Sequence, residues 1–246
     1  MKTKSIAIIG STCELGVELS KIYAKNNYDL ILIARNRNKN LELKNDIKNE
    51  FSKINITCFE LDILKIENHT KILEDLKFIP DGVISLIGET HNVENVQEKN
   101  FIKIINVNFT CLVSFLTLFL IKFEERNSGF LICVSSVAGI RGRAKNFIYG
   151  SAKAALTTFM SGCRSLYLNK NIFIMTVLPG YINNNENDKR KKIAEKILSI
   201  RPSVLATKIY DAHMKKKEVV YSSYIWLIIM NIIAILPTKI FKRINL

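Results

Sequence analysis

Short, uninterrupted apolar runs alternate along most of the chain with longer segments in which apolar residues recur at helical spacing. The short runs predict strands, and their lack of apolar-polar alternation indicates burial on both faces. They lie at residues 5–9, 29–34, 56–61, 82–87, 130–135 and 173–178. The longer segments predict helices at residues 15–26, 41–53, 66–76, 101–122 and 151–168.

Strands separated by single helices pair in parallel, because the chain must cross over before the next strand begins. This rhythm predicts an α/β fold with a single doubly wound parallel sheet of the Rossmann type. A chain of 246 residues suits one such domain. We expect that domain at residues 1–220, followed at residues 221–246 by an apolar helix with one polar edge and a basic tail.

The composition narrows the function classes. Hydrophobic residues make up 48% of the chain, which excludes extensive disorder. The net charge of +14 leaves an anionic substrate or a membrane surface open, but the basic residues are scattered without interleaved aromatic residues, so we expect no nucleic-acid partner. The five cysteines lie in apolar surroundings and the three histidines share no ligand spacing, which predicts a reducing, cytoplasmic compartment and no metal site.

A glycine-containing turn joins the first predicted strand to the first helix. It reads Gly10-Ser11-Thr12-Cys13-Glu14-Leu15-Gly16. Glycines here let backbone N–H groups approach a pyrophosphate at the positive end of the helix. Glycine also occurs at such turns for geometric reasons alone, so the placement after the first strand of a βαβ unit is what favours a dinucleotide site.

Two further positions bear on the cofactor. Arg35 and Arg37 follow the second strand, where an acidic residue would bind the ribose of NAD(H), so they favour the 2′-phosphate of NADP(H) or form a solvated basic loop. Asp62, followed by Ile63, comes directly after the third strand and either accepts a hydrogen bond from adenine or caps the next helix. NADP(H) is the expected cofactor, with NAD(H) as the alternative.

A tyrosine and a lysine four positions apart carry the candidate chemistry. Tyr149 and Lys153 share one helix face, and an ammonium beside a phenol lowers the pKa of the phenol towards working pH. Ser136 ends the preceding strand, at the sheet edge where such folds bind ligands. The Tyr-x-x-x-Lys spacing is common by chance, and its order after a phosphate turn and a serine is what makes it informative.

Residues 3–185 resemble the short-chain dehydrogenase/reductase family on these motifs. The resemblance implies that Tyr149 donates a proton to a substrate carbonyl and that Lys153 also holds the nicotinamide ribose. It further implies that Ser136 orients the carbonyl and that Asn108 completes a proton relay through water.

The same resemblance places Pro179 and Gly180 in the cofactor-binding segment after the sixth strand. Two positions depart from the family pattern. The usual Asn-Asn-Ala-Gly after the fourth strand is replaced by Ser85-Leu86-Ile87-Gly88, where Gly88 still permits close backbone approach. Glu14 replaces the central glycine of the turn, which puts an acid near a phosphate unless its side chain points away.

The turn and the segment Ser135–Gly150 also resemble reductases of polyprenyl-phosphoryl pentoses in cell-envelope arabinose synthesis. That subgroup reduces a 2-keto pentofuranose supplied by a partner, a flavin-dependent sugar oxidase. Arg141 and Arg143, with Lys145, are then candidates to contact the substrate phosphodiester, or they form a solvated basic loop.

The apolar run Tyr224–Leu236 is too short to span a bilayer, since thirteen residues of helix extend about 20 Å against a hydrocarbon core of about 30 Å. We expect it to lie on the inner face of the plasma membrane, with Tyr224 and Trp226 at the interface and the basic tail on anionic lipids. A buried helix or a dimer contact is the alternative. Residues 111–123 are expected to pack in the core or in a homo-oligomer.

Together these features predict an NAD(P)H-dependent oxidoreductase that reduces a keto-sugar carried on a polyprenyl phosphate. The same chemistry would also suit a nucleotide sugar, a lipid ketone or an oxoacyl thioester. A cofactor-binding scaffold without turnover is the rival from another class, and the complete Ser-Tyr-Lys-Asn set argues against it.

Overall fold

A seven-stranded parallel sheet forms the centre of the computed structural model, which describes residues 3–90, 98–183 and 198–243. The strand order is β3-β2-β1-β4-β5-β6-β9, and every adjacent pair is parallel. The strands are β1 (Ser5–Ile9), β2 (Asp29–Ala34), β3 (Ile56–Glu60), β4 (Gly82–Ser85), β5 (Gly129–Val134), β6 (Ile172–Leu178) and β9 (Val219–Tyr221). This confirms the predicted doubly wound α/β sheet and adds β9, which the hydrophobic pattern did not reveal.

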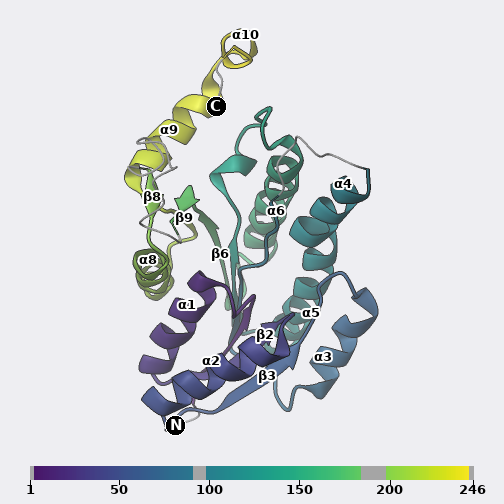
Figure 1. The fold of residues 1–246 in the computed structure, drawn as a ribbon, viewed down its shortest axis with the longest axis vertical. Coiled ribbons are helices and arrows are strands. Elements are labelled where there is room, and N and C mark those ends of the chain that lie inside the picture. The colour runs from purple at the N-terminus through teal and green to yellow at the C-terminus, as the bar shows by residue number, and fades with distance from the viewer. Residues whose placement is uncertain (1–2, 91–97, 184–197, 244–246) are drawn as a thin grey trace.

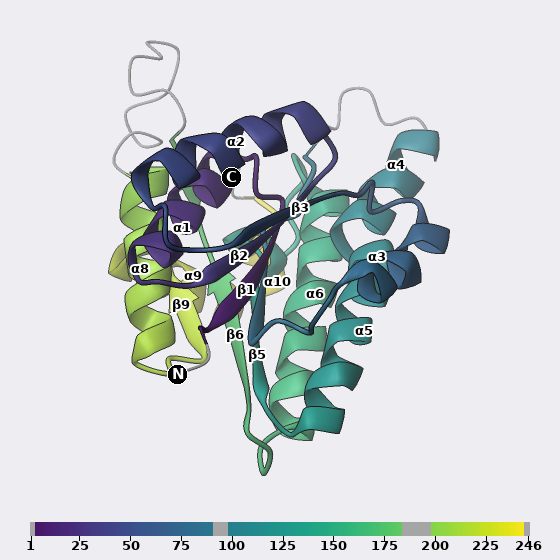
Figure 2. The ribbon, with the colours of Figure 1, turned by 90° about the horizontal axis from the view of Figure 1, so that it is seen from below.

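Helices cover both faces of the sheet (Figures 1 and 2). Helices α1, α2 and α8 pack on one face, and α3, α5 and α6 on the other. Their bounds are α1 (Glu14–Lys25), α2 (Arg37–Glu50), α3 (His69–Asp75), α4 (Glu98–Ile105), α5 (Cys111–Arg126), α6 (Phe147–Leu166) and α8 (Pro202–Met214). Shorter elements are η1 (Ile66–Asn68), η3 (Asn106–Thr110), η4 (Val137–Gly139), β7 (Tyr181–Ile182) and β8 (Ser199–Ile200).

The order of the strands places the candidate site. β1 and β4 are neighbours at the centre of the sheet, although the chain runs from β1 outwards to β3 before it returns to β4. Connections from these two strands therefore leave in opposite directions and open a crevice at the carboxyl ends of the strands. The phosphate turn and Gly88 both lie at this crevice.

The run Asn100–Arg126 is the one helix of the described residues that is long and apolar enough to cross a membrane. Half of its most apolar window is buried. Phe115, Phe119 and Phe123 of α5 are fully buried in the core against the sheet. This packing supports the interpretation of residues 111–123 as a core helix.

The C-terminal segment forms α9 (Tyr224–Ile235) and α10 (Thr238–Phe241), which lie beyond the sheet at the end away from the N-terminus (Figure 1). Ser223 caps α9, because its hydroxyl accepts a hydrogen bond from the backbone N–H of Trp226 at 3.2 Å. One face of α9, formed by Trp226, Met230 and Ile233, packs on Val137 and Leu178. The predicted C-terminal helix is thus present and partly buried.

Candidate active site

The turn after β1 forms a backbone cradle at the start of α1. Gly10 has φ of +88°, a left-handed conformation that favours glycine, and its N–H donates to the carbonyl of Ile33 at 2.8 Å. A Cβ added at Gly16 would lie 2.6 Å from the carbonyl oxygens of Gly10 and Ser11. Only glycine at position 16 lets the turn fold this closely onto the helix, so the cradle fits a pyrophosphate at a helix N-terminus.

A cavity of about 310 Å³ opens at this turn, between the carboxyl ends of the central strands. Six of the residues predicted to bind the cofactor line it: Gly10, Thr12, Arg35, Asp62, Ile63 and Gly88. Asp62 faces the cavity and its carboxylate accepts a hydrogen bond from the N–H of Leu64 at 3.1 Å, but it does not cap the next helix, η1, which begins after Lys65 without a side-chain cap. The predicted contact with adenine stays a prediction. The cavity and its lining suit a dinucleotide.

Four residues of the turn do not line this cavity with their side chains. Ser11 is buried and its hydroxyl donates to Oδ1 of Asn40 at 2.8 Å, which ties the turn to α2. Leu15 is buried in the core, and Gly16 acts by having no side chain. Glu14 is exposed at the first position of α1, so its carboxylate points away from the cavity.

Lys39 lies at the cavity, where the sequence had suggested Arg37. The side chain of Asn36 accepts a hydrogen bond from the N–H of Lys39 at 3.0 Å and so begins α2. Lys39 therefore lies one helical turn after Arg35, and both line the cavity. Arg37 instead lines a separate cavity between α2 and α3. The N-cap signal at Asn36 would have identified Lys39, since it fixes which residues of the first turn share a face.

Three of the four predicted catalytic residues meet in a second cavity, of about 610 Å³. Ser136, Tyr149 and Lys153 line it, together with Pro179 and Gly180. Leu86 and Gly88 line both cavities, so the two adjoin at the end of β4. A nicotinamide extending from the first cavity would reach the tyrosine and lysine of the second.

Tyr149 and Lys153 lie on the same face of α6. The Nζ atom of Lys153 is 5.8 Å from the centroid of the Tyr149 ring. Lys153 is 1% exposed, and its ammonium donates to the carbonyl oxygens of Ile87 at 3.0 Å and Val134 at 3.2 Å. These bonds fix the ammonium between β4 and β5, beside the phenol.

The pKa values in this cavity differ from the sequence-based expectation. Burial raises the pKa of the Tyr149 phenol, and a hydrogen bond with the Ser136 side chain lowers it by less. Burial also lowers the pKa of Lys153 to about 8. The expected net lowering of the phenol pKa is therefore not found, because desolvation of the phenolate outweighs the groups that stabilise it.

Asn108 lies behind the site and does not line either cavity. Its side-chain amide donates to the carbonyl oxygens of Glu89 at 2.8 Å and Ile104 at 2.9 Å, and its Oδ1 accepts the N–H of Glu89 at 3.2 Å. It is buried in the π-helical turn η3. The side chain thus positions the segment after β4, and the predicted proton relay stays a prediction.

Arg141 points away from the catalytic cavity. Its guanidinium donates to the carbonyl oxygens of Ile233 and Leu236 at the end of α9 and lies 4.2 Å from the centroid of the Phe241 ring. These contacts satisfy helix-terminal carbonyls, which is a favourable place for a cation. We therefore do not keep Arg141 among the substrate residues, whereas Arg143 and Lys145 do line the cavity.

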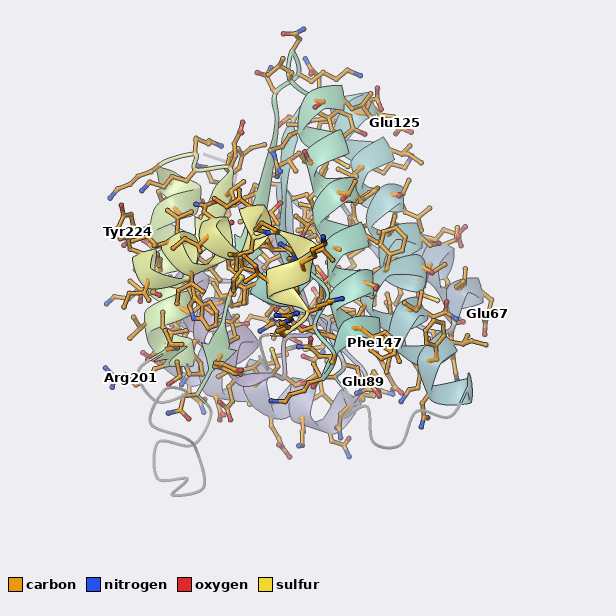
Figure 3. All side chains as sticks on the ribbon, turned by 90° about the horizontal axis from the view of Figure 1, so that it is seen from above. Glu67, Glu89, Glu125, Phe147, Arg201 and Tyr224 are labelled. Atoms are coloured by element: carbon orange, nitrogen blue, oxygen red, sulfur yellow. The ribbon has the colours of Figure 1, made fainter. Side chains whose placement is uncertain are left out.

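Trp226 forms a wall of the catalytic cavity, which the sequence did not indicate. It is 4% exposed, and its indole N–H donates to the carbonyl of Leu198 at 2.8 Å. A Cβ added at Gly180 would lie 2.0 Å from the indole nitrogen, so the ring lies directly on this glycine. The expectation that Trp226 lies at a membrane interface is wrong, whereas Tyr224 is 72% exposed and points outwards (Figure 3).

Among the described residues, no group of three His, Cys, Asp or Glu side chains is arranged to hold a metal ion. His69 and His213 are buried far apart in sequence, each in contact with phenylalanine.

Comparisons with known proteins identify related sequences and folds. The Dehydrogenase/reductase SDR family protein 7-like of Dictyostelium discoideum is 28% identical over 206 residues, which cover 78% of this chain and 63% of that protein. The very-long-chain 3-oxoacyl-CoA reductase of Rattus norvegicus is 26% identical over 196 residues, covering 77% of this chain and 62% of the relative. The chain thus spans less than two thirds of the length of these two relatives.

A solved structure of ElxO with NADP bound shares the fold. Its TM-score is 0.77 at 21% identity, covering 92% of this chain and 99% of the other. A family model described as short chain dehydrogenase matches residues 4–195, which is more than half of the sequence. The chain belongs to the short-chain dehydrogenase family.

Proposed function

We propose that this protein is an NAD(P)H-dependent reductase of a ketone, with Tyr149 as the proton donor. One observation carries the proposal: Ser136, Tyr149 and Lys153 line one cavity that adjoins, at Gly88, a second cavity built for a dinucleotide. A scaffold that only binds a cofactor has no use for this arrangement of proton-transferring groups.

The chain's own residues divide the work as follows. NADPH, when bound, would supply the hydride that reduces the carbonyl carbon. The raised pKa keeps the Tyr149 phenol protonated at neutral pH, so the phenol can give its proton to the carbonyl oxygen. The Ser136 hydroxyl donates to the same oxygen and holds it near the phenol. The buried Lys153 ammonium stabilises the tyrosinate that forms, because opposite charges attract more strongly where water is largely excluded from one of them.

For the cofactor we propose NADP(H) over NAD(H). Arg35 and Lys39 place two cations on the wall of the dinucleotide cavity, where a ribose 2′-phosphate is a natural partner. An acidic side chain that would prefer the ribose hydroxyls of NAD(H) is absent from the described residues at the end of β2, whose next four residues are Arg35, Asn36, Arg37 and Asn38. The structure of ElxO with NADP bound supports the same choice.

For the substrate we propose a 2-keto pentofuranose on a polyprenyl phosphate, used in cell-envelope synthesis and supplied by a flavin-dependent sugar oxidase. Arg143 and Lys145 offer cations to a phosphodiester at one side of the catalytic cavity. Trp226 and Tyr181 provide aromatic surface on the same cavity, which suits a sugar ring and the start of a lipid. An oxoacyl thioester is the second candidate, favoured by the likeness to very-long-chain 3-oxoacyl-CoA reductases.

The proposal includes attachment to the inner face of the plasma membrane through α9. The outward face of this helix carries Ile225, Ile228, Ile232 and Ile235, which are 46–82% exposed. Lys239, Lys242 and Arg243 follow it with three positive charges. An exposed apolar stripe next to cations is typical of a helix that lies on anionic lipid. We also propose a homo-oligomer, in which the exposed Ile121 of α5 and Phe147 of α6 would contact a second copy of the chain.

The reductase proposal is tested by following the loss of NADPH absorbance with the lipid-linked 2-keto pentose and, separately, with a long-chain 3-oxoacyl-CoA. Tyr149→Phe should lower turnover by about 100-fold or more while NADPH still binds. Tyr181→Phe, which removes another phenol from the same cavity, is the matched control and should change turnover by far less. Equal turnover of wild type and Tyr149→Phe on every carbonyl that is reduced would contradict the proposal.

Membrane attachment has its own test, because it can fail while the reductase is real. Ile228→Glu combined with Ile232→Glu places charge on the outward face of α9 without touching its packed face. The double variant should no longer sediment with phosphatidylglycerol vesicles, whereas wild type should. Sedimentation of both proteins to the same extent would exclude α9 as the attachment.

A further inference from the structure

A third cavity, of about 840 Å³, lies outside the candidate active site, between α8, β9 and the start of α9. Figure 1 shows these three elements together on one flank of the molecule. None of its lining residues lines either of the two cavities of the candidate active site, so it is a separate feature. The proposed reaction leaves it without a role.

The walls of this cavity are largely apolar. Val204 and Ala212 contribute from α8, Val219 from β9 and Leu227 from α9. The highly exposed Tyr224 stands at the rim, and the next turn of α9 carries the outward isoleucine face. An apolar chain seated in the cavity could therefore continue along the surface that we propose to meet the membrane.

The polar part of the lining is dominated by ammonium groups. Lys208, Lys215 and Lys217 line the cavity against the single carboxylate of Asp211. In the part of the chain that the structure describes, Lys208 and Lys217 form no ion pair, and the Lys208 ammonium donates only to the carbonyl of Ser222, at 3.1 Å. This concentration of unpaired positive charge beside apolar walls is the complement of an anionic amphiphile.

The electrostatics of Lys208 point the same way. Partial burial and the neighbouring Lys217 ammonium both lower the pKa of Lys208. An anion between the two lysines would reverse that repulsion, since each ammonium would then face a negative charge. An anionic ligand would therefore stabilise the two ammonium groups in the cavity.

We propose that this cavity binds an anionic phospholipid, with the phosphate between Lys208 and Lys217 and the first part of an acyl chain against Leu227 and Tyr224. The inference deepens the proposed membrane attachment and uses no step of the proposed reduction. An added peptide strand is the rival occupant, but β9 is only three residues long and offers little backbone for pairing. A free phosphate is the other source of the same anion chemistry.

The experiment titrates the full chain with monomeric dihexanoyl phosphatidylglycerol, with dihexanoyl phosphatidylcholine and with inorganic phosphate, by calorimetry. Lys208→Glu combined with Lys217→Glu reverses the charge of the cavity. Lys53→Glu combined with Lys77→Glu makes the same change in net charge on exposed loops and is the matched control. Thr207→Trp fills the cavity from the exposed side of α8 without changing any charge.

We expect phosphatidylglycerol to bind wild type and the control equally, and to bind the charge-reversed and filled variants about 10-fold more weakly or worse. Equal affinity for all four proteins would overturn the proposal, as would inorganic phosphate binding as tightly as the lipid. Unchanged melting temperatures of the variants establish that each is folded. A wild-type dimer that dissociates on Thr207→Trp would also overturn it, because a second copy of the chain would then cover the cavity.

This result is independent of the test of α9. If Ile228→Glu with Ile232→Glu abolishes vesicle binding while monomeric lipid still binds, the cavity is a lipid site and α9 is a separate anchor. If vesicles bind through α9 but monomeric lipid does not bind, the cavity inference fails and membrane attachment stands. Activity towards a ketone enters neither outcome.

Discussion

The dinucleotide cavity and the catalytic cavity both contain Gly88 in their walls, yet they depend on different parts of the chain: backbone in the first and side chains in the second. The first depends on backbone, through the turn after β1 and the close approach of Gly16 to two carbonyl oxygens. The second depends on side chains from distant parts of the chain, including Trp226 from α9. The difference teaches that a local motif can specify a cofactor site, whereas the substrate side needs the whole fold.

The largest expected effect tests the backbone side of this comparison. Gly16→Ala forces a Cβ against the carbonyl oxygens of Gly10 and Ser11, so the cradle must open. We expect dinucleotide binding to weaken by about 100-fold or more, because the backbone N–H groups of the turn would no longer all point at the pyrophosphate. Gly162→Ala on α6, where a Cβ meets nothing within 4 Å, is the matched control, and fluorescence titration with NADPH measures both.

A smaller effect is expected in the catalytic cavity, which depends on side chains. Trp226→Ala removes a buried indole and should lower the free energy of unfolding by about 3 kcal/mol. It should also raise the KM of the ketone while the Kd of NADPH is unchanged. Ile235→Ala, on the same helix but 82% exposed, should change stability by about 0.5 kcal/mol or less. Equal destabilisation by the two variants in urea titrations would refute the buried position of the indole.

The smallest expected effect concerns the contact between α1 and α8. His213 of α8 lies 2.7 Å from the phenol oxygen of Tyr23 on α1, is 3% exposed, and has its pKa lowered to about 4 by burial. Because the unfolded histidine takes up a proton at higher pH than the folded one, stability should fall as the pH drops from 6.5 towards 4. We expect a loss of about 2 kcal/mol between about pH 8 and pH 5.

His213→Asn is the control for this pH dependence, because its amide oxygen can still accept from the Tyr23 hydroxyl but does not titrate. The difference between the two stability curves, measured by urea unfolding across the pH range, isolates the histidine from the carboxylates. Parallel curves would show that protonation of His213 plays no part.

The sequence was most informative where function rests on local geometry. Buried strands, the phosphate turn and the Tyr149–Lys153 spacing were all visible, because each is set by residues close together in the chain. Lys39 is identifiable from the sequence only when α2 is taken to begin after its cap, Asn36. The roles of residues whose partners lie far away in the sequence cannot be predicted from such local patterns.

Trp226 and Arg141 show why. An aromatic residue in an apolar helix and an arginine in a basic loop both suggest contact with the surroundings, yet one is buried on Gly180 and the other binds the end of α9. Their partners lie tens of residues away in sequence, and no periodicity records them. The sign of the pKa change at Tyr149 was also hidden, because it depends on how much water reaches the phenol.

The bonds from Arg141 to the end of α9 limit how this protein can be engineered. The loop that carries Arg141 also carries Arg143 and Lys145, which line the catalytic cavity, so the position of this loop depends on α9. A chimera that replaces the tail with that of a relative would have to import the matching loop as well. An insertion directly after Leu236 should therefore alter the positions of Arg143 and Lys145 at the catalytic cavity.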